Sequence, residues 1–153
     1  MASWVILVGS PYDQGKCSTA ATRIANALRE LGNSVALFSC AHIAVHGCIG
    51  CDQCKESFTC IYSDDLARIF SALDTADAVL VVSPIYFAGV PSQFKAVLDR
   101  FQPYFWKRQQ QIEQGRPLPA KRALYVRSLA KEEIRMALLL RCLLYTSDAA
   151  DEL

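Results

Sequence analysis

Short apolar runs alternate with amphipathic stretches along most of the chain. Four runs are almost wholly aliphatic or aromatic and predict buried strands, over residues 4–8, 34–38, 78–82 and 123–126. Three stretches place their apolar residues at helical spacing and predict helices, over residues 18–31, 64–73 and 91–101. Strands that are apolar at every position must be covered on both faces, so this pattern predicts a doubly wound α/β fold with a parallel sheet.

In such a sheet, ligands bind beyond the carboxyl ends of the strands, near the point where the strand order reverses. We therefore expect chemistry in the loops that follow Val8, Phe38, Val82 and Val126.

The composition supports one cytoplasmic domain. A chain of 153 residues with 52% hydrophobic and 20% charged residues fits one compact domain, and fits neither a coiled coil nor a disordered chain. The 16 Lys and Arg nearly balance the 15 Asp and Glu, so no chain-wide basic field favours nucleic acid or an anionic membrane. The sequence shows neither a signal peptide nor a run of the roughly 20 apolar residues that a membrane span needs. A small-molecule partner is the better expectation.

The end of the chain departs from this pattern. Residues Cys142 to Glu152 resemble the translated end of a transposase-type sequencing adapter, which encodes Cys142 to Asp151 in one reading frame and allows Asp or Glu at position 152. We therefore expect residues 1–141 to form a C-terminally truncated domain and residues 142–153 to be a non-native tail. Without the acidic residues of that tail, the remainder is mildly basic.

The loop between the first strand and the first helix has the composition of an anion site. It runs from Gly9 to Ser18 and leads into a helix N-terminus, where backbone N–H groups and the helix dipole favour phosphate. Ser10, Lys16 and Ser18 can add donors, and an ordinary turn is the alternative. The loop spacing and Cys17 argue against a nucleoside-triphosphate P-loop. The helical residues that follow Cys17 argue against the phosphate loop of a thiolate phosphatase.

A second loop with candidate chemistry follows the third strand, over residues 83–91. It carries Tyr86 and Phe87 between Pro84 and Pro91, and can present backbone amides and a flat apolar wall to a planar heterocycle. The alternative is that both aromatic rings pack beneath the next helix.

Four cysteines follow the second strand with the spacing C-x2-C-x2-C-x5-C, at Cys48, Cys51, Cys54 and Cys60. Four thiolates from one short segment can hold an iron–sulfur cluster, and the first three repeat the x2 spacing of bacterial ferredoxins. Zinc bound by the same thiolates is the main rival. Four unliganded thiols and disulfides are further alternatives, the latter disfavoured in a reducing cytosol. His42 and His46 flank the cysteines and are expected to take no part, since four thiolates complete a site.

A basic stretch lies after the third predicted helix. It contains Lys107, Arg108, Arg116, Lys121, Arg122 and Arg127, with Glu113 the only acidic residue among them. We expect a solvated connection here, with attraction of a pyridine-nucleotide phosphate as the alternative.

Two blocks of sequence together are typical of a known family. The first is Cys48-Ile49-Gly50-Cys51-x2-Cys54 with Cys60 and Asp64-Asp65, and the second is Ser83-Pro84-Ile85-Tyr86-Phe87 leading to Pro91-Ser92-Gln93-Phe94-Lys95-x3-Asp99-Arg100. Over residues 5–126 the chain resembles the NAD(P)H-dependent FMN reductase superfamily of flavodoxin-like proteins, and within it the iron–sulfur flavoproteins.

The resemblance implies an FMN-dependent oxidoreductase that moves electrons from NAD(P)H through FMN, with a 4Fe–4S cluster, to a small-molecule or protein acceptor. It assigns cofactor binding to two loops. In the loop after the first strand the residues are Ser10, Tyr12, Gly15, Lys16, Cys17 and Ser18, and in the loop after the third strand they are Ser83, Pro84, Ile85, Tyr86 and Phe87. It assigns metal binding to Cys48, Cys51, Cys54 and Cys60. The flavin carries the chemistry, so no catalytic side chain is expected.

Two other functions fit the same residues. One is a flavin-only NAD(P)H:quinone or FMN reductase whose cysteines are structural or bind zinc. The other is a non-enzymatic redox carrier or sensor.

The resemblance also implies the strand order 2-1-3-4-5, with the fifth strand beyond Arg141 and missing through truncation. The fourth strand would then form an open edge. The full-length protein would be a homo-oligomer that binds neither nucleic acid nor membrane. The first loop departs from the family pattern, with Tyr12 for Arg, Lys16 for Asn and Cys17 for Thr, and Lys16 can restore the positive charge.

Overall fold

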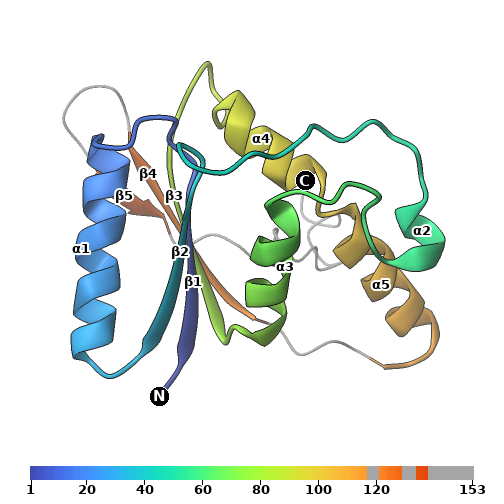
Figure 1. The fold of residues 1–153 in the computed structure, drawn as a ribbon. Helices are drawn as coiled ribbons and strands as arrows, with labels where there is room; N and C mark the ends of the chain where they lie inside the picture. The colour runs from blue at the N-terminus through green and yellow to red at the C-terminus, as the bar shows by residue number, and fades with distance from the viewer. Residues whose placement is uncertain (117–120, 129–133, 138–153) are drawn as a thin grey trace.

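A four-stranded parallel sheet forms the centre of the molecule (Figure 1). The computed structural model describes residues 1–116, 121–128 and 134–137. The parallel strands are β1 (Ser3–Val8), β2 (Ser34–Ser39), β3 (Ala78–Pro84) and β4 (Arg122–Ser128). They lie in the order β2-β1-β3-β4, with β1 pairing in parallel with both β2 and β3. This confirms the predicted α/β class and the flavodoxin-like order 2-1-3-4.

Helices cover both faces of the sheet, because alternate residues of each strand point to opposite sides. On one face, Ile6 and Val8 share a core with α1 (Lys16–Glu30). On the other face, Val5 and Leu7 pack with residues of α3 (Leu66–Thr75) and α4 (Ser92–Asp99). Figure 1 shows α1 alone on its side and α3, α4 and α5 (Gln102–Glu113) on the opposite side. None of the helices in the described ranges is both long and apolar enough to cross a bilayer.

The chain turns back after β4 and adds a strand that the sequence analysis did not predict. The strand β5 (Ile134–Ala137) pairs antiparallel with β4, with Val126 opposite Met136. The expectation that β4 forms an open edge is therefore wrong. A parallel crossover needs about a dozen or more residues, so the short connection between these strands permits only antiparallel pairing. The parallel fifth strand expected beyond Arg141, and the tail over residues 142–153, lie outside the described residues.

Two helices were also missed. The four-residue helix α2 (Cys54–Ser57) begins at one of the four predicted metal-binding cysteines. The helix α5 begins directly after the third predicted helix and extends into the stretch expected to be a solvated connection, and Pro103 lies in its first turn, where proline is favoured. Its Tyr104 packs edge-on against Phe70 of α3, with ring centroids 5.0 Å apart. This contact attaches α5 to the domain although most of its residues are polar.

Candidate functional site

The loops after β1 and β3 leave the sheet side by side at its carboxyl end. The backbone N–H of Gly9 donates to the carbonyl of Val82, at 2.8 Å. A Cβ on Gly9 would lie 2.6 Å from Ser83 Oγ and 2.8 Å from the ring of Phe94, so no larger residue fits there without displacement. Glycine at this position therefore lets the first loop pass directly against β3 and α4.

The first loop folds back on the N-terminus of α1. The hydroxyl of Ser18 donates to the carbonyl of Tyr12 at 2.8 Å, and the Tyr12 N–H donates to Ser10 Oγ at 3.1 Å. Gly15 caps the helix without a side-chain hydrogen bond, and the first turn of α1 holds no acidic residue. The first turn of α1 thus brings no carboxylate to offset the positive end of the helix dipole, which suits an anion such as phosphate. Lys16 is exposed at the same helix end.

The other predicted residues of this loop lie differently. Tyr12 is exposed, whereas the side chain of Cys17 is buried in the core beneath α1. Cys17 therefore lies below the loop surface rather than on it. The ring Nε2 of His42, just after β2, lies 2.6 Å from Oδ1 of Asp13. His42 thus links the first two loops.

The third loop forms a tight hairpin directly after β3. The backbone groups of Tyr86 and Gly89 exchange two hydrogen bonds, of 2.8 and 2.9 Å. Phe87 and Ala88 between them have φ of 50° and 64°, in the left-handed region that residues other than glycine rarely adopt. The Phe87 ring is fully exposed, and Tyr86 is 42% exposed. The alternative that both rings pack beneath the next helix is therefore wrong.

The first and third loops approach each other at their aromatic residues. Burial raises the pKa of Tyr86, and the neighbouring Tyr12 and Cys17 raise it further. Both effects agree with a Tyr86 hydroxyl that faces the first loop. Ser83 is completely buried at the end of β3, where its hydroxyl donates to the Pro84 carbonyl at 3.1 Å. The structure thus brings the predicted phosphate-binding and ring-binding residues together at one end of the sheet.

The segment that carries the cysteines leaves β2 and runs past α3 to α2 (Figure 1). Cys48 and Cys51 are exposed, and Cys54 and Cys60 are half-buried. All four line one pocket of about 280 Å³, together with Ile49, Ile61, Tyr62, Arg100 and Pro103. Cys48, Cys51, Cys54 and Cys60 are free thiols.

The other three thiols of the site lie close enough to Cys54 to affect its pKa. Partial burial raises the pKa of Cys54, and Cys51, Cys60 and Cys48 raise it further because thiolates repel one another. A cationic metal centre would relieve that repulsion, so the donor set fits a thiolate-bound metal group. Among the described residues, no three His, Cys, Asp or Glu side chains lie close enough together to hold a single metal ion. The four thiols share one pocket but do not form a ready-made site for a single ion.

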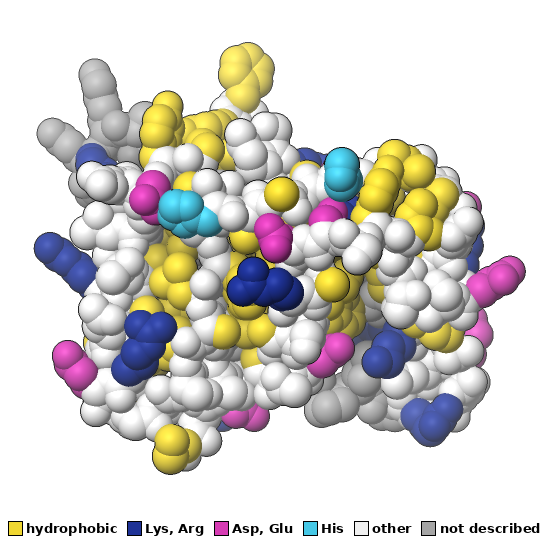
Figure 2. All heavy atoms as spheres, viewed as in Figure 1, with side chains coloured by type: hydrophobic (Ala, Val, Ile, Leu, Met, Phe, Trp, Pro, Cys, Tyr) yellow, Lys and Arg dark blue, Asp and Glu magenta, His cyan; other side chains and the backbone are white. Residues whose placement is uncertain are grey.

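Acidic and basic side chains are interspersed on the face of the molecule that Figure 2 shows. Hydrophobic side chains gather on the same face near the segment that leads to α2. Ile49 and Ile61, which line the pocket with the cysteines, are 63% and 46% exposed. An apolar rim of this kind limits the access of water to a metal centre.

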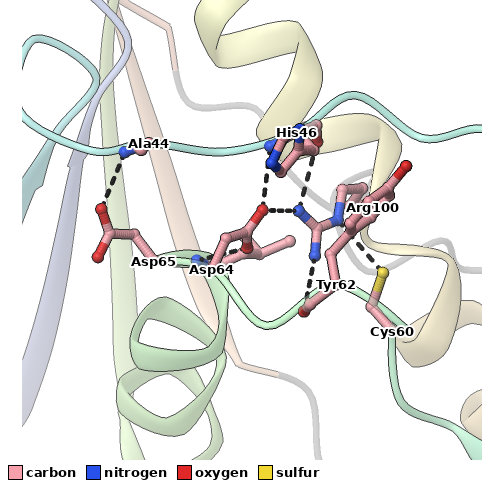
Figure 3. A network of polar contacts seen from close by, with 8 residues as sticks. Ala44, His46, Cys60, Tyr62, Asp64, Asp65 and Arg100 are labelled. Atoms are coloured by element: carbon pink, nitrogen blue, oxygen red, sulfur yellow. Dashed lines mark hydrogen bonds and ion pairs between the residues drawn. The ribbon is translucent and has the colours of Figure 1, made fainter.

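A buried arginine connects the cysteine segment to the core (Figure 3). The Arg100 side chain is 1% exposed and forms an ion pair with Asp64. Burial opposes the ionisation of Asp64, but the Arg100 guanidinium and the N–H groups of His46 and Leu66 hold its pKa below the usual value. The pKa of Arg100 is raised by Asp64 and Cys60 despite its burial. Both groups are therefore charged inside the protein.

Asp65 makes a similar contact with the backbone before the cysteines, where it accepts a hydrogen bond from the Ala44 N–H at 2.9 Å. Asp64, Asp65 and Arg100 belong to the two motif blocks, and Asp64 was expected at most to cap the second helix, but no role in the site was predicted for any of them. Helical spacing offered a signal, because Arg100 follows the buried Val97 by three residues and so falls on the same face. A charged residue on an apolar helix face points to a buried partner.

Comparison with known proteins agrees with this architecture. A family model described as NADPH-dependent FMN reductase matches residues 2–149. An iron–sulfur flavoprotein of Methanocaldococcus jannaschii is 36% identical over 95 residues, which cover 62% of this chain and 49% of that protein. An iron–sulfur flavoprotein of Archaeoglobus fulgidus is 33% identical over 101 residues, covering 64% of this chain and 44% of that protein. The chain spans about half the length of these relatives.

Solved structures share the fold at low sequence identity. A flavone reductase superimposes with a TM-score of 0.59 at 15% identity, covering 85% of this chain and 44% of that one. The NAD(P)H:quinone oxidoreductase from Methanothermobacter marburgensis gives a TM-score of 0.53 at 16% identity, covering 65% of this chain and 52% of that one.

Proposed function

This chain belongs to the NADPH-dependent FMN reductase family, and on that basis we propose that it binds FMN at the carboxyl end of its parallel sheet and a 4Fe–4S cluster at its four-cysteine segment. Electrons would pass from NAD(P)H through the flavin and the cluster to a small-molecule or protein acceptor. The family implies FMN and NAD(P)H, and the curated relatives are named iron–sulfur flavoproteins.

The first loop supplies the groups that an FMN phosphate requires. The N-terminus of α1 offers backbone N–H groups and a positive dipole end, and Lys16 adds a full charge at the same place. Lys16 offers in this way the charge that the family's arginine provides elsewhere in the loop. Ser10 and Ser18 hold the loop in shape through Tyr12, so their main role is to position its backbone.

The third loop supplies a surface for the isoalloxazine ring. Its hairpin holds Phe87 out of the core. Two of its residues, Phe87 and Ala88, lie in the left-handed region, and this conformation costs about 1–2 kcal/mol of free energy per residue. Strain of this kind persists where the surrounding structure enforces it, commonly at binding sites. FMN, when bound, supplies the capacity to accept a hydride and release single electrons. The residues of this chain bind and orient the ring and require no acid or base.

The cysteine segment supports a cluster better than zinc. A zinc ion needs four sulfur atoms about 2.3 Å from one point, whereas a 4Fe–4S cluster spreads its ligands over separate iron atoms. The thiols line one pocket, and among the described residues no three of them form a ready-made single-ion site. The spacing of Cys48, Cys51 and Cys54 also matches that of ferredoxins.

One observation carries the flavin part of the proposal, namely that the first and third loops meet at the end of the sheet. A fluorescence titration of FMN with the full chain tests it. We expect saturable quenching of flavin emission with a stoichiometry of one, because the ring would lie against Tyr86 and Phe87. Emission that stays constant up to a large excess of protein would remove the flavin site.

A further inference from the structure

The two ends of the cysteine segment meet on a single side chain (Figure 3). His46 lies just before the first cysteine and Tyr62 just after the last. Arg100 Nη1 donates to the His46 carbonyl at 3.3 Å, and Nη2 donates to the Tyr62 carbonyl at 3.4 Å. The rings of His46 and Tyr62 stack with centroids 4.9 Å apart, and the guanidinium lies 5.0 Å from the Tyr62 ring centroid. Arg100 therefore bridges the base of the segment.

The core fixes Arg100 in place. It follows the last turn of α4, and its charge is neutralised by Asp64 in a site where the Asp64 side chain is 9% exposed. The second contact of Asp64 Oδ2 is the His46 N–H, at 3.0 Å. Asp64 thus holds both the arginine and one end of the segment that the arginine bridges.

Arg100 also contacts one of the thiols directly. Its Nε–H donates to Cys60 Sγ at 3.3 Å. A hydrogen bond from a charged donor to a thiolate is stronger than one between neutral groups. It also stabilises a metal centre more strongly after the centre gains an electron, because the added charge is negative and is shared with the sulfur ligands.

From these contacts we propose that Arg100 is the positioning residue of the four-cysteine site: it closes the segment between His46 and Tyr62 in the absence of metal, and its Nε–H raises the reduction potential of the centre through Cys60. Closing a flexible loop costs entropy, and a segment that is already closed does not incur this cost when metal binds. The closure needs only the contacts described, whereas the effect on potential rests on the proposed function.

Hydrogen–deuterium exchange of the metal-free full chain tests the closure. The variant Arg100→Lys keeps the positive charge for Asp64 but cannot bridge both carbonyls and Cys60 at once. We expect amides between residues 44 and 62 to exchange at least about tenfold faster than in the parent, with β1 and β3 unchanged. The matched control is Arg68→Lys, an exposed arginine of α3, which should leave these amides as they are. Equal exchange in the parent and Arg100→Lys would overturn the closure.

If Arg100→Lys does not fold, Asp64→Asn provides the same test, because it leaves the arginine in place and removes its ionic anchor. We expect the same amides to exchange faster, and unchanged exchange would again count against the closure.

A redox titration after anaerobic reconstitution with iron and sulfide tests the contact with Cys60. At equal iron content, we expect Arg100→Lys to lower the equilibrium constant for reduction of the metal centre by about tenfold, as for the loss of one charge-assisted hydrogen bond. The potential of bound FMN should stay constant. An unchanged potential of the metal centre would overturn the electronic role. If the parent takes up no iron, the proposed cluster fails and that role with it, while the exchange experiment still decides the closure.

Discussion

At the scale of single residues, the four cysteines of the site differ from the core cysteine Cys40 in their exposure. Cys40 lies in the core, where burial raises its pKa to about 11. It therefore stays a neutral thiol near pH 7 and is a poor metal ligand. Cys48, Cys51, Cys54 and Cys60 line a pocket open to solvent. Position and exposure, more than residue type, separate ligand candidates from core residues here.

We predict that Cys51→Ser abolishes iron binding and leaves FMN bound, because the cysteines and the phosphate loop are separate segments. Iron content and flavin content of the anaerobically reconstituted protein measure both effects. The control is Cys40→Ala, which should retain iron. Equal iron content in Cys51→Ser and the parent would show that the four cysteines do not form the site.

Gly9 is the residue on which the approach of the two loops depends. We predict that Gly9→Ala destabilises the protein by about 1–3 kcal/mol, because the added methyl group overlaps Ser83 and Phe94. Urea unfolding measures the loss. The control is Gly47→Ala, since a Cβ at Gly47 meets nothing within 4 Å. A fully stable Gly9→Ala would mean that the first loop does not pass as close to β3 as described.

At the scale of elements, apolar periodicity predicted the strands and helices that pack an apolar face against the core. The strands β1 and β3 and the helices α1, α3 and α4 bury apolar faces, and their predicted positions agree with the observed ones to within a few residues. The strand β2 was also predicted in the right place, but it lies at the edge of the sheet and is only partly buried, with Leu37 36% exposed. The helix α5 was missed because its residues are mostly polar and only Pro103 is buried. The strand β5 was missed because its pairing with β4 defines it, not a pattern of its own.

The candidate site was predictable where a motif is local. The strand pattern predicted that the loops after β1 and β3 lie together at the carboxyl end of the sheet, as the structure has them. The assignment of their residues and of the cysteines to cofactors stays a prediction. The link between Arg100 and Asp64 joins positions that lie 36 residues apart in the chain. No local pattern reports such a pairing, because tertiary packing alone brings the two side chains together.

A substitution in the hairpin after β3 can distinguish a residue that binds FMN from one that stabilises the fold. Phe87 is fully exposed, so we predict that Phe87→Ala changes the free energy of unfolding by less than about 0.5 kcal/mol but weakens FMN binding severalfold. Urea unfolding and the fluorescence titration measure the two quantities. The control is Leu31→Ala, an exposed residue at the end of α1, which should alter neither. A parental FMN affinity in Phe87→Ala would place the ring elsewhere.

At the scale of the whole molecule, the ion pair between Arg100 and Asp64 makes stability depend on pH. The pKa of Asp64 is lower in the folded protein than in the unfolded chain. Its contribution is therefore complete above the unfolded value of about 3.9 and is lost as the pH falls through the folded value. We predict that the stability of the parent falls more steeply below pH 4 than that of Asp64→Asn. Urea unfolding at a series of pH values checks this, and parallel curves would contradict it.

The same variant should be less stable at neutral pH. Removing one partner of a buried ion pair typically costs about 3–5 kcal/mol, since the remaining charge is left uncompensated. Asp52→Asn, at an exposed carboxylate paired with Lys55, should cost less than about 1 kcal/mol.

The account as a whole requires two cofactors in two separate places on one domain. The flavin and iron contents of the full chain, purified without oxygen and supplied with FMN, iron and sulfide, test this most directly. We predict one flavin and one cluster per chain, with flavin absorption bands above a broad sulfur-to-iron band that dithionite bleaches. A colourless protein after this treatment would contradict the account.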